Sequence, residues 1–164
     1  MKRAQLSRSD SLGRYAVGVI CAAVLMAGAL LVSGPAQAID AFYNSDGIAI
    51  EGTDPVAYFT EGKPVEGKED ITYDFGGVTW RFATAANRDA FAADPQRYAP
   101  QYGGYCAWAV SQGYTASTVR EAWHIEDGKL YLNYSKGVQS RWAEDIPGHI
   151  SQADANWPGL KGGN

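Results

Sequence analysis

Sulfur and imidazole side chains are scarce in this sequence. The 164 residues include two cysteines, two methionines and two histidines, and the first 38 residues contain Cys21 and both methionines. From residue 39 onward the chain has one thiol, Cys106, and two imidazoles, His124 and His149. A single thiol excludes an intrachain disulfide and a four-cysteine site, and it allows at most one mixed site of Cys, His and carboxylate or water.

Positive charge and the common catalytic motifs are also lacking. The first 38 residues hold four of the 14 basic side chains and one of the 18 acidic ones, so the remainder has ten positive and 17 negative side chains. This balance provides no basic patch for phosphate, and we expect neither nucleic acid nor an anionic membrane as a partner. There is no G-x-S-x-G, no phosphate loop and no H-E-x-x-H motif, so none of these motifs indicates a reaction. Whether the protein is an enzyme stays open, and a non-enzymatic protein is favoured.

The first 38 residues have the three parts of a secretory signal. Four basic side chains precede an uncharged apolar run at residues 16–32, and Ala36-Gln37-Ala38 supplies the small residues of a cleavage site. A transmembrane anchor is the alternative, but the run is at the lower limit of length for spanning a bilayer. We expect cleavage after Ala38, loss of Cys21 with the signal, no stable membrane anchor, and a periplasmic or secreted protein.

Residues 39–164 are predicted to form one α+β domain. Alternating apolar and polar residues flank Gly76-Gly77 and, further on, Asp127-Gly128, and each pattern indicates a β-hairpin. Helices are predicted over residues 84–93, 135–142 and about 147–155. The expected architecture is a small antiparallel sheet built from the two hairpins, with helices packed against it.

The segment around Cys106 is the strongest candidate for chemistry. If a helix begins near Tyr105, Cys106 lies in its first turn, where the helix dipole lowers the pKa of a thiol below its usual value of about 8.5. Tyr102, Tyr105 and Trp108 could form the wall of a pocket around it. Burial among these side chains acts in the opposite direction, and the other interpretation of Cys106 is a small packed residue.

The other candidate residues have simpler structural explanations. Strand alternation places His124 opposite its core-facing neighbours, so exposure to solvent is favoured over a role as metal ligand. His149, near the last helix, is also expected at the surface. Asp54-Pro55 is typical of a turn, with the Asp54 carboxylate capping the residues that follow.

Five separated segments carry a resemblance to a known family. They are Asp54-Pro55-Val56-Ala57-Tyr58-Phe59, Trp80-Arg81-Phe82, Phe91 to Tyr98, Tyr102-Gly103-Gly104-Tyr105-Cys106-Ala107 and Asp127 to Asn133. Together they resemble the exported YHS domain-containing proteins of bacteria. The resemblance extends from about Gly47 to Pro158 and implies an association with heavy-metal handling, including copper-transporting ATPases. Some members of that group are described as selenoproteins, with selenocysteine at the position that matches Cys106, which implies redox or soft-metal chemistry there.

The sequence departs from the metal-binding members at their ligand positions. Those members carry one cysteine near the start of the domain and two between the second strand and the helix. Here Ala83 and Asn87 stand at the later two positions, so Cys106 is the only soft donor left.

Three hypotheses follow. The first is a binding module for a soft, copper-like metal ion, held by Cys106 with an imidazole such as His124 or with a ligand from an exported protein partner. The second is a redox protein in which Cys106 reacts with a partner thiol. The third is a structural or interaction domain without chemistry at Cys106.

Overall fold

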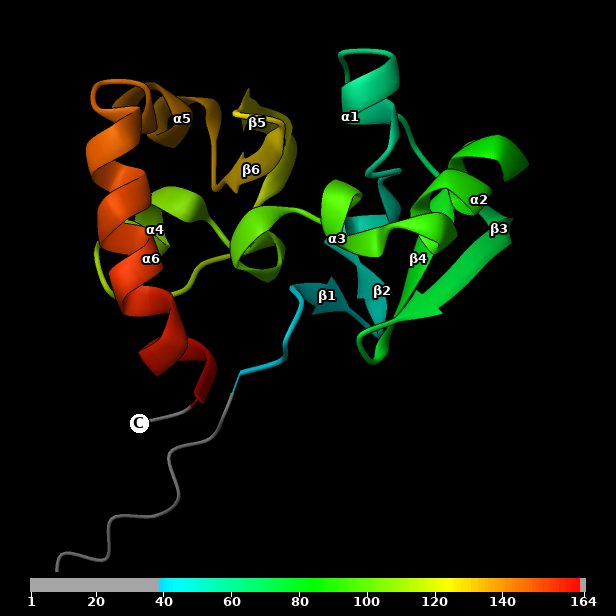
Figure 1. Cartoon of the computed structure of the whole chain (residues 1–164), viewed down its shortest axis with the longest axis horizontal. Helices are drawn as coiled ribbons and strands as arrows, with labels where there is room; N and C mark the ends of the chain where they lie inside the picture. The colour runs from blue at the N-terminus through cyan, green and yellow to red at the C-terminus, as the bar shows by residue number, and fades with distance from the viewer. Residues whose placement is uncertain (1–38, 163–164) are drawn as a thin grey trace, which may run out of the picture. The chain divides into compact units, whose positions relative to one another are not determined.

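The computed structural model describes residues 39–162, which form a single α+β domain with six α-helices (Figure 1). The secretory segment predicted at residues 1–38 lies outside this range. Within residues 39–162, no helix is both long and apolar enough to cross a bilayer.

The first predicted hairpin belongs to a mixed four-stranded sheet. Strands β3 and β4 pair antiparallel, and a short strand β2 pairs parallel to β4, with Ile48 opposite Thr79. Alternate residues of β4 are buried, which is the pattern expected when one face of a strand covers a core. The sheet order is β1 (Asn44–Ser45), β2 (Ile48–Ala49), β4 (Val78–Phe82) and β3 (Lys68–Phe75).

The second predicted hairpin forms a sheet of its own. Strand β5 (Val119–Glu126) pairs antiparallel with β6 (Lys129–Asn133). Asp127 and Gly128 both have positive φ, at 49° and 72°, as the predicted tight turn requires. The α+β class is confirmed, but the hairpins do not share one sheet. The second hairpin contributes Leu130 and Leu132 to the core that also holds β4 residues, an arrangement that local sequence patterns do not encode.

The predicted helix starts are confirmed by their caps. The Thr84 hydroxyl accepts a hydrogen bond from the N–H of Asn87, and the Ser135 hydroxyl accepts one from the N–H of Val138. Such bonds satisfy backbone donors that a helix leaves unpaired at its first turn. The helices are α1 (Ala57–Thr60), α2 (Ala85–Ala93), α3 (Pro95–Tyr98), α4 (Ala107–Ser111), α5 (Lys136–Trp142) and α6 (Ile146–Gly162).

Strand β6 lies between two hydrophobic cores. Leu130 and Leu132 point into a first core that is built mainly on the four-stranded sheet, α1 and α2. Tyr131, on the opposite face, belongs to a second core with Trp142 and Ala153 from helices α5 and α6. These three side chains are all buried because successive residues of a strand point to opposite faces, and here both faces are covered.

Candidate functional site

A buried carboxylate joins two distant segments of the first core. Asp54 is 0 % exposed, and its Oδ1 accepts hydrogen bonds from the N–H groups of Val56, at 2.9 Å, and Ala57, at 3.3 Å. This is the predicted cap. Its Oδ2 accepts from the N–H of Ala83 at 2.8 Å and from the side-chain amide of Asn87 at 2.7 Å. Sequence reasoning missed this second pair, because these donors lie 29 and 33 residues away.

The Asp54 cluster occupies the place where the resemblance puts metal-binding thiols. Ala83 and Asn87 stand at the two later ligand positions, and both donate to the same carboxylate oxygen. Four donors satisfy the buried charge, so the cluster serves as a cross-link between the start of α1 and the connection from β4 to α2.

A left-handed turn leads into Cys106. Tyr102, Gly103 and Gly104 have φ values of 53°, 62° and 83°. A Cβ on Gly103 would lie 2.2 Å from the carbonyl oxygen of Ala41, so the close approach of the two chain segments requires glycine there.

Cys106 immediately precedes helix α4 rather than lying in its first turn. Its N–H donates to the carbonyl of Ala116 at 3.0 Å, and its carbonyl accepts from the N–H of Val110 at 3.0 Å. The helix has only five residues, so the dipole that was expected to lower the thiol pKa is short.

The Cys106 thiol is buried and hydrogen-bonded. It is 1 % exposed, and its Sγ accepts from the N–H of Tyr134 at 3.3 Å. The S–H donates weakly to Oδ1 of Asn133 at 3.8 Å, and the same oxygen accepts from the N–H of Trp108 at 3.2 Å. Asn133 thereby favours the protonated thiol, because the carbonyl oxygen of its amide can accept the S–H but would repel a thiolate.

Burial decides the acidity of this thiol. It raises the pKa of Cys106 above the ordinary value, and hydrogen bonds from the backbone of Ala109, Tyr134 and Trp108 lower the pKa by less. The expectation of a pKa below about 8.5 was therefore wrong. The sequence showed both effects, but only the structure shows that the thiol is covered.

A small apolar cavity of about 210 Å³ lies over Cys106. Trp108 lines it, and the Arg141 guanidinium lies 5.6 Å from the centre of the indole ring. The sequence did not predict the two other aromatic residues of the lining, Tyr114 after helix α4 and Tyr134 after strand β6. The lining residues are Cys106, Trp108, Ala109, Tyr114, Ala116, Tyr134 and Val138.

Tyr102 and Tyr105 do not line this cavity. Tyr102 is buried in the second core, where its hydroxyl donates to Asp154 at 2.9 Å. The Tyr105 hydroxyl donates to the carbonyl of Asp40 at 3.2 Å. Both side chains point toward elements that follow or precede the segment by many residues, and no local pattern in the sequence specifies those contacts.

Comparison with known families identifies one segment of the chain. Residues 56–102 match the YHS domain family. The chain contains a YHS domain. YHS domains are associated with metal-binding and transport proteins. No curated protein and no solved structure matches the chain.

Cys106 lies just outside the matched YHS domain, which ends at Tyr102. The cavity over the thiol is built from helix α4, the segment after it, the end of β6 and helix α5. The thiol and its surroundings therefore belong to the part of the fold that follows the YHS domain.

His124 is placed away from the polar contacts of Cys106. It lies opposite Tyr131 in the β5–β6 pair, and its Nε2 lies 2.9 Å from a carboxylate oxygen of Glu126. Its side chain is about one third exposed (34 %). Within residues 39–162, no three side chains of His, Cys, Asp or Glu lie close enough together to hold a metal ion. His149 stacks on Trp142 with ring centres 5.6 Å apart.

Proposed function

We propose that this chain is a non-enzymatic, exported binding module in which Cys106 provides one ligand to a soft, copper-like metal ion and a partner provides the others. The observation that carries the proposal is the thiol beneath an apolar cavity with aromatic walls. Thiolate is the ligand type that selects Cu(I) over harder ions, and the association of YHS domains with metal-binding proteins favours the same class.

The surroundings of Cys106 explain why a partner is needed. A metal ion on this thiol would meet Trp108, Tyr114 and Tyr134, which are weak ligands at best. The remaining ligands must then enter through the cavity, from a second protein or from a small thiol. Two of the side chains that line the cavity are well exposed, Tyr114 at 47 % and Tyr134 at 55 %, and they provide apolar surface for such contact.

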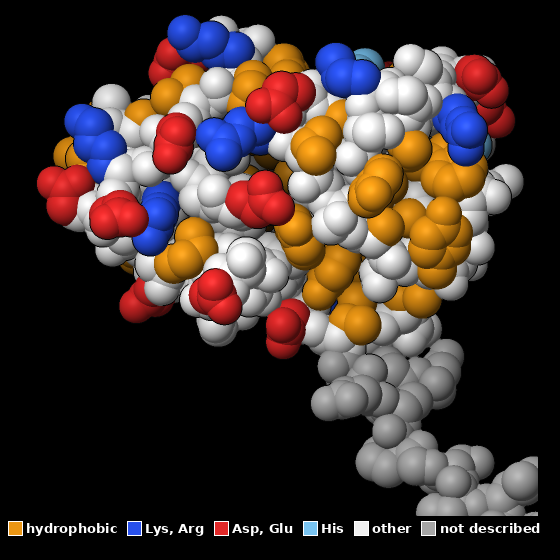
Figure 2. All heavy atoms as spheres, turned by 180° about the vertical axis from the view of Figure 1, so that it is seen from behind, with side chains coloured by type: hydrophobic (Ala, Val, Ile, Leu, Met, Phe, Trp, Pro, Cys, Tyr) orange, Lys and Arg blue, Asp and Glu red, His pale blue; other side chains and the backbone are white. Residues whose placement is uncertain are grey.

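One face of the molecule has a concentration of apolar side chains. Figure 2 shows hydrophobic side chains gathered over one half of that face, while acidic and basic side chains intermix over the other half. Apolar surface of this kind is what a docking protein buries on binding.

A thiol-exchange function is the second candidate, and the backbone N–H groups around Sγ favour it. In such a reaction the Cys106 thiolate attacks a partner disulfide, a mixed disulfide forms, and the partner's second sulfur leaves as a thiolate. Three N–H donors near Sγ would stabilise the attacking thiolate. No other cysteine follows residue 38, so a partner thiol must resolve the mixed disulfide.

The test uses the periplasmic product of the full 164-residue sequence, whose intact mass also shows whether it begins at Ile39. We expect one equivalent of Cu(I) to transfer from its glutathione complex to the wild type, no transfer to Cys106→Ser, and unchanged transfer to His124→Ala. Bound copper is measured by mass spectrometry under native conditions. A product that retains residues 1–38 would contradict export.

The same experiment separates the alternatives. Undiminished copper in Cys106→Ser would overturn the ligand assignment. Loss of copper binding in His124→Ala would mean that the His124 imidazole, and not a partner, supplies the second ligand. A stable adduct with oxidised glutathione, in the absence of copper transfer, would favour thiol exchange. If neither product forms, the interaction domain is the remaining hypothesis.

A further inference from the structure

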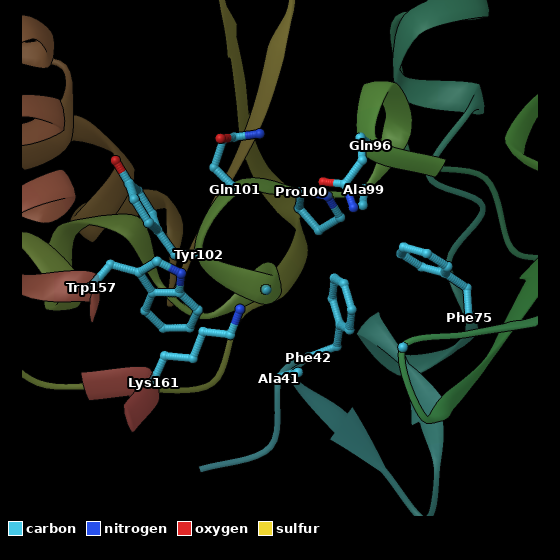
Figure 3. Close-up of a pocket in the computed structure, with 12 residues that line it drawn as sticks. Ala41, Phe42, Phe75, Gln96, Ala99, Pro100, Gln101, Tyr102, Trp157 and Lys161 are labelled. Carbon is cyan, nitrogen blue, oxygen red and sulfur yellow. The ribbon is translucent and has the colours of Figure 1, made fainter. Parts of the chain in front are cut away.

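A second and larger cavity, of about 390 Å³, lies where three parts of the chain meet (Figure 3). Residues 41–42 line it from the N-terminal side, and helix α6 lines it through Trp157 and Lys161. The YHS domain contributes the remainder, apart from Gly103 just beyond its end. The volume is within the range of sites that hold small organic molecules. Neither the thiol nor either histidine lines this cavity, so it is separate from the copper site proposed above.

Two aromatic side chains form rigid walls. Phe42 packs against Phe75 and Trp80, with ring centres 5.7 Å and 5.2 Å apart. Trp157 packs against Tyr102 with ring centres 6.0 Å apart. Because neighbouring rings already hold both side chains, a planar ligand could stack on either with little further loss of side-chain freedom.

Three polar side chains line the same cavity. Gln96 and Gln101 lie on the side of the cavity opposite Lys161, and Lys161 extends toward the region between Trp157 and Phe42 (Figure 3). Lys161 is the only charged side chain that lines the cavity, and no carboxylate of residues 39–162 pairs with it. The two amides make no hydrogen bond within the same described residues, so their donors and acceptors are available to a ligand.

The backbone around the cavity is held in an unusual conformation. Tyr102 lines it with a φ of 53°, a left-handed value that is uncommon for a tyrosine. Gly76 also has positive φ, and a Cβ there would lie 2.3 Å from the ring of Phe42. The close approach at Gly76 keeps Phe42 beside the YHS domain. Non-glycine residues with positive φ, such as Tyr102, concentrate at ligand sites.

We propose that this cavity binds a small planar aromatic molecule that carries a carboxylate. The ring lies against Phe42 or Trp157, the carboxylate pairs with the Lys161 ammonium, and the Gln96 and Gln101 amides bind polar atoms on the ring edge. The single cation matches one negative charge, whereas a polyphosphate would require several. The absence of thiol, imidazole and carboxylate from the lining argues against a metal ion at this place.

The probe is naphthalene-2-carboxylate, compared with the neutral naphthalene-2-carboxamide, and binding is measured by saturation-transfer NMR at about 0.15 M salt. We expect Lys161→Met to weaken carboxylate binding about threefold, the effect of a partly exposed ion pair, and to leave carboxamide binding unchanged. Trp157→Leu should weaken both compounds. Gln101→Leu, a substitution at a half-exposed side chain, provides a second variant that should fold normally.

Two control variants locate the site. Lys129→Met removes the same charge in the β5–β6 hairpin, away from the cavity, and should bind both probes as the wild type does. Cys106→Ser should also bind them normally, which separates this site from the proposed copper site. No saturation transfer at millimolar probe, equal effects of Lys161→Met and Lys129→Met, or loss of binding in Cys106→Ser would each overturn the proposal.

Discussion

Asp54 and Cys106 are two buried side chains with different sets of hydrogen-bond partners. Both lie at or near zero exposure. The carboxylate has four hydrogen-bond donors to its two oxygens, so its charge is satisfied. The thiol has an acceptor, Asn133, that favours its neutral form, and burial raises its pKa. The two side chains have similar depth, so the number and kind of their hydrogen-bond partners distinguish them.

The Asp54 cross-link gives a stability prediction at the residue scale. We expect Asp54→Ala to lower the free energy of unfolding by about 3 kcal/mol or more, because it leaves the N–H groups of Ala83 and Val56 without their acceptor in a buried site. Asp94→Ala is the matched control. Its side chain caps α3 at an exposed position, and its loss should cost about 1 kcal/mol. Urea unfolding measures both, and equal losses would contradict the cross-link.

Secondary structure was predictable from sequence where its determinants are local. Thr84 and Ser135 cap the helices that begin after them, and Asp127-Gly128 turns the second hairpin, since each effect depends on residues within one turn. The parallel pairing of β2 with β4 depends on residues 31 positions apart, Ile48 and Thr79, and no local pattern specifies it. The division of the strands into two sheets also depends on pairing between residues far apart in the sequence.

The candidate site was predictable in part. The position of Cys106 beside Trp108 could be inferred from the segment itself. The walls provided by Tyr114 and Tyr134 could not, because they depend on how the hairpin and α4 pack. The acidity of the thiol also depends on that packing, so its sign could be decided only from the structure.

Strand β6 gives the prediction at the scale of an element. Leu132 is buried in the first core, so Leu132→Ala should lower the free energy of unfolding by about 2 to 5 kcal/mol. Val119→Ala, at a position of β5 that is 38 % exposed, should cost under about 1 kcal/mol. Unfolding should stay a single transition in both variants, because β6 packs against both cores. A second transition in thermal unfolding, or equal losses, would contradict this role.

At the scale of the whole molecule, buried tyrosines predict sensitivity to alkali. Burial raises the pKa of Tyr131 to about 12 and raises the pKa of Tyr58 and Tyr102 further, from the ordinary value of about 10. Burial also raises the pKa of Cys106. All four groups lose their protons more readily in the unfolded chain. Their contribution to the free energy of unfolding is therefore complete below about pH 8.5, and it is lost as the pH rises from there toward and beyond 12.

The measurement is urea unfolding at a series of pH values from 8 to 11. The free energy of unfolding should fall above about pH 8.5, most steeply above about pH 10, where each buried tyrosine contributes up to about 1.4 kcal/mol per pH unit. Tyr131→Phe should reduce the slope, whereas Tyr134→Phe, at an exposed tyrosine, should leave it unchanged. A stability that does not vary with pH would contradict the assignment.

Because β6 contributes to the first core, the limits of that core differ from the limits of the family match. The stretch that family comparison recognises, residues 56–102, draws Ala49, Ile50, Leu130 and Leu132 into its core from outside its own limits. A gene fragment cut at those limits would encode the inherited motif without the partners that exclude water from it. The limits of the family match therefore differ from the limits of the folded core. A fusion protein that carries the matched segment must also include the β5–β6 hairpin.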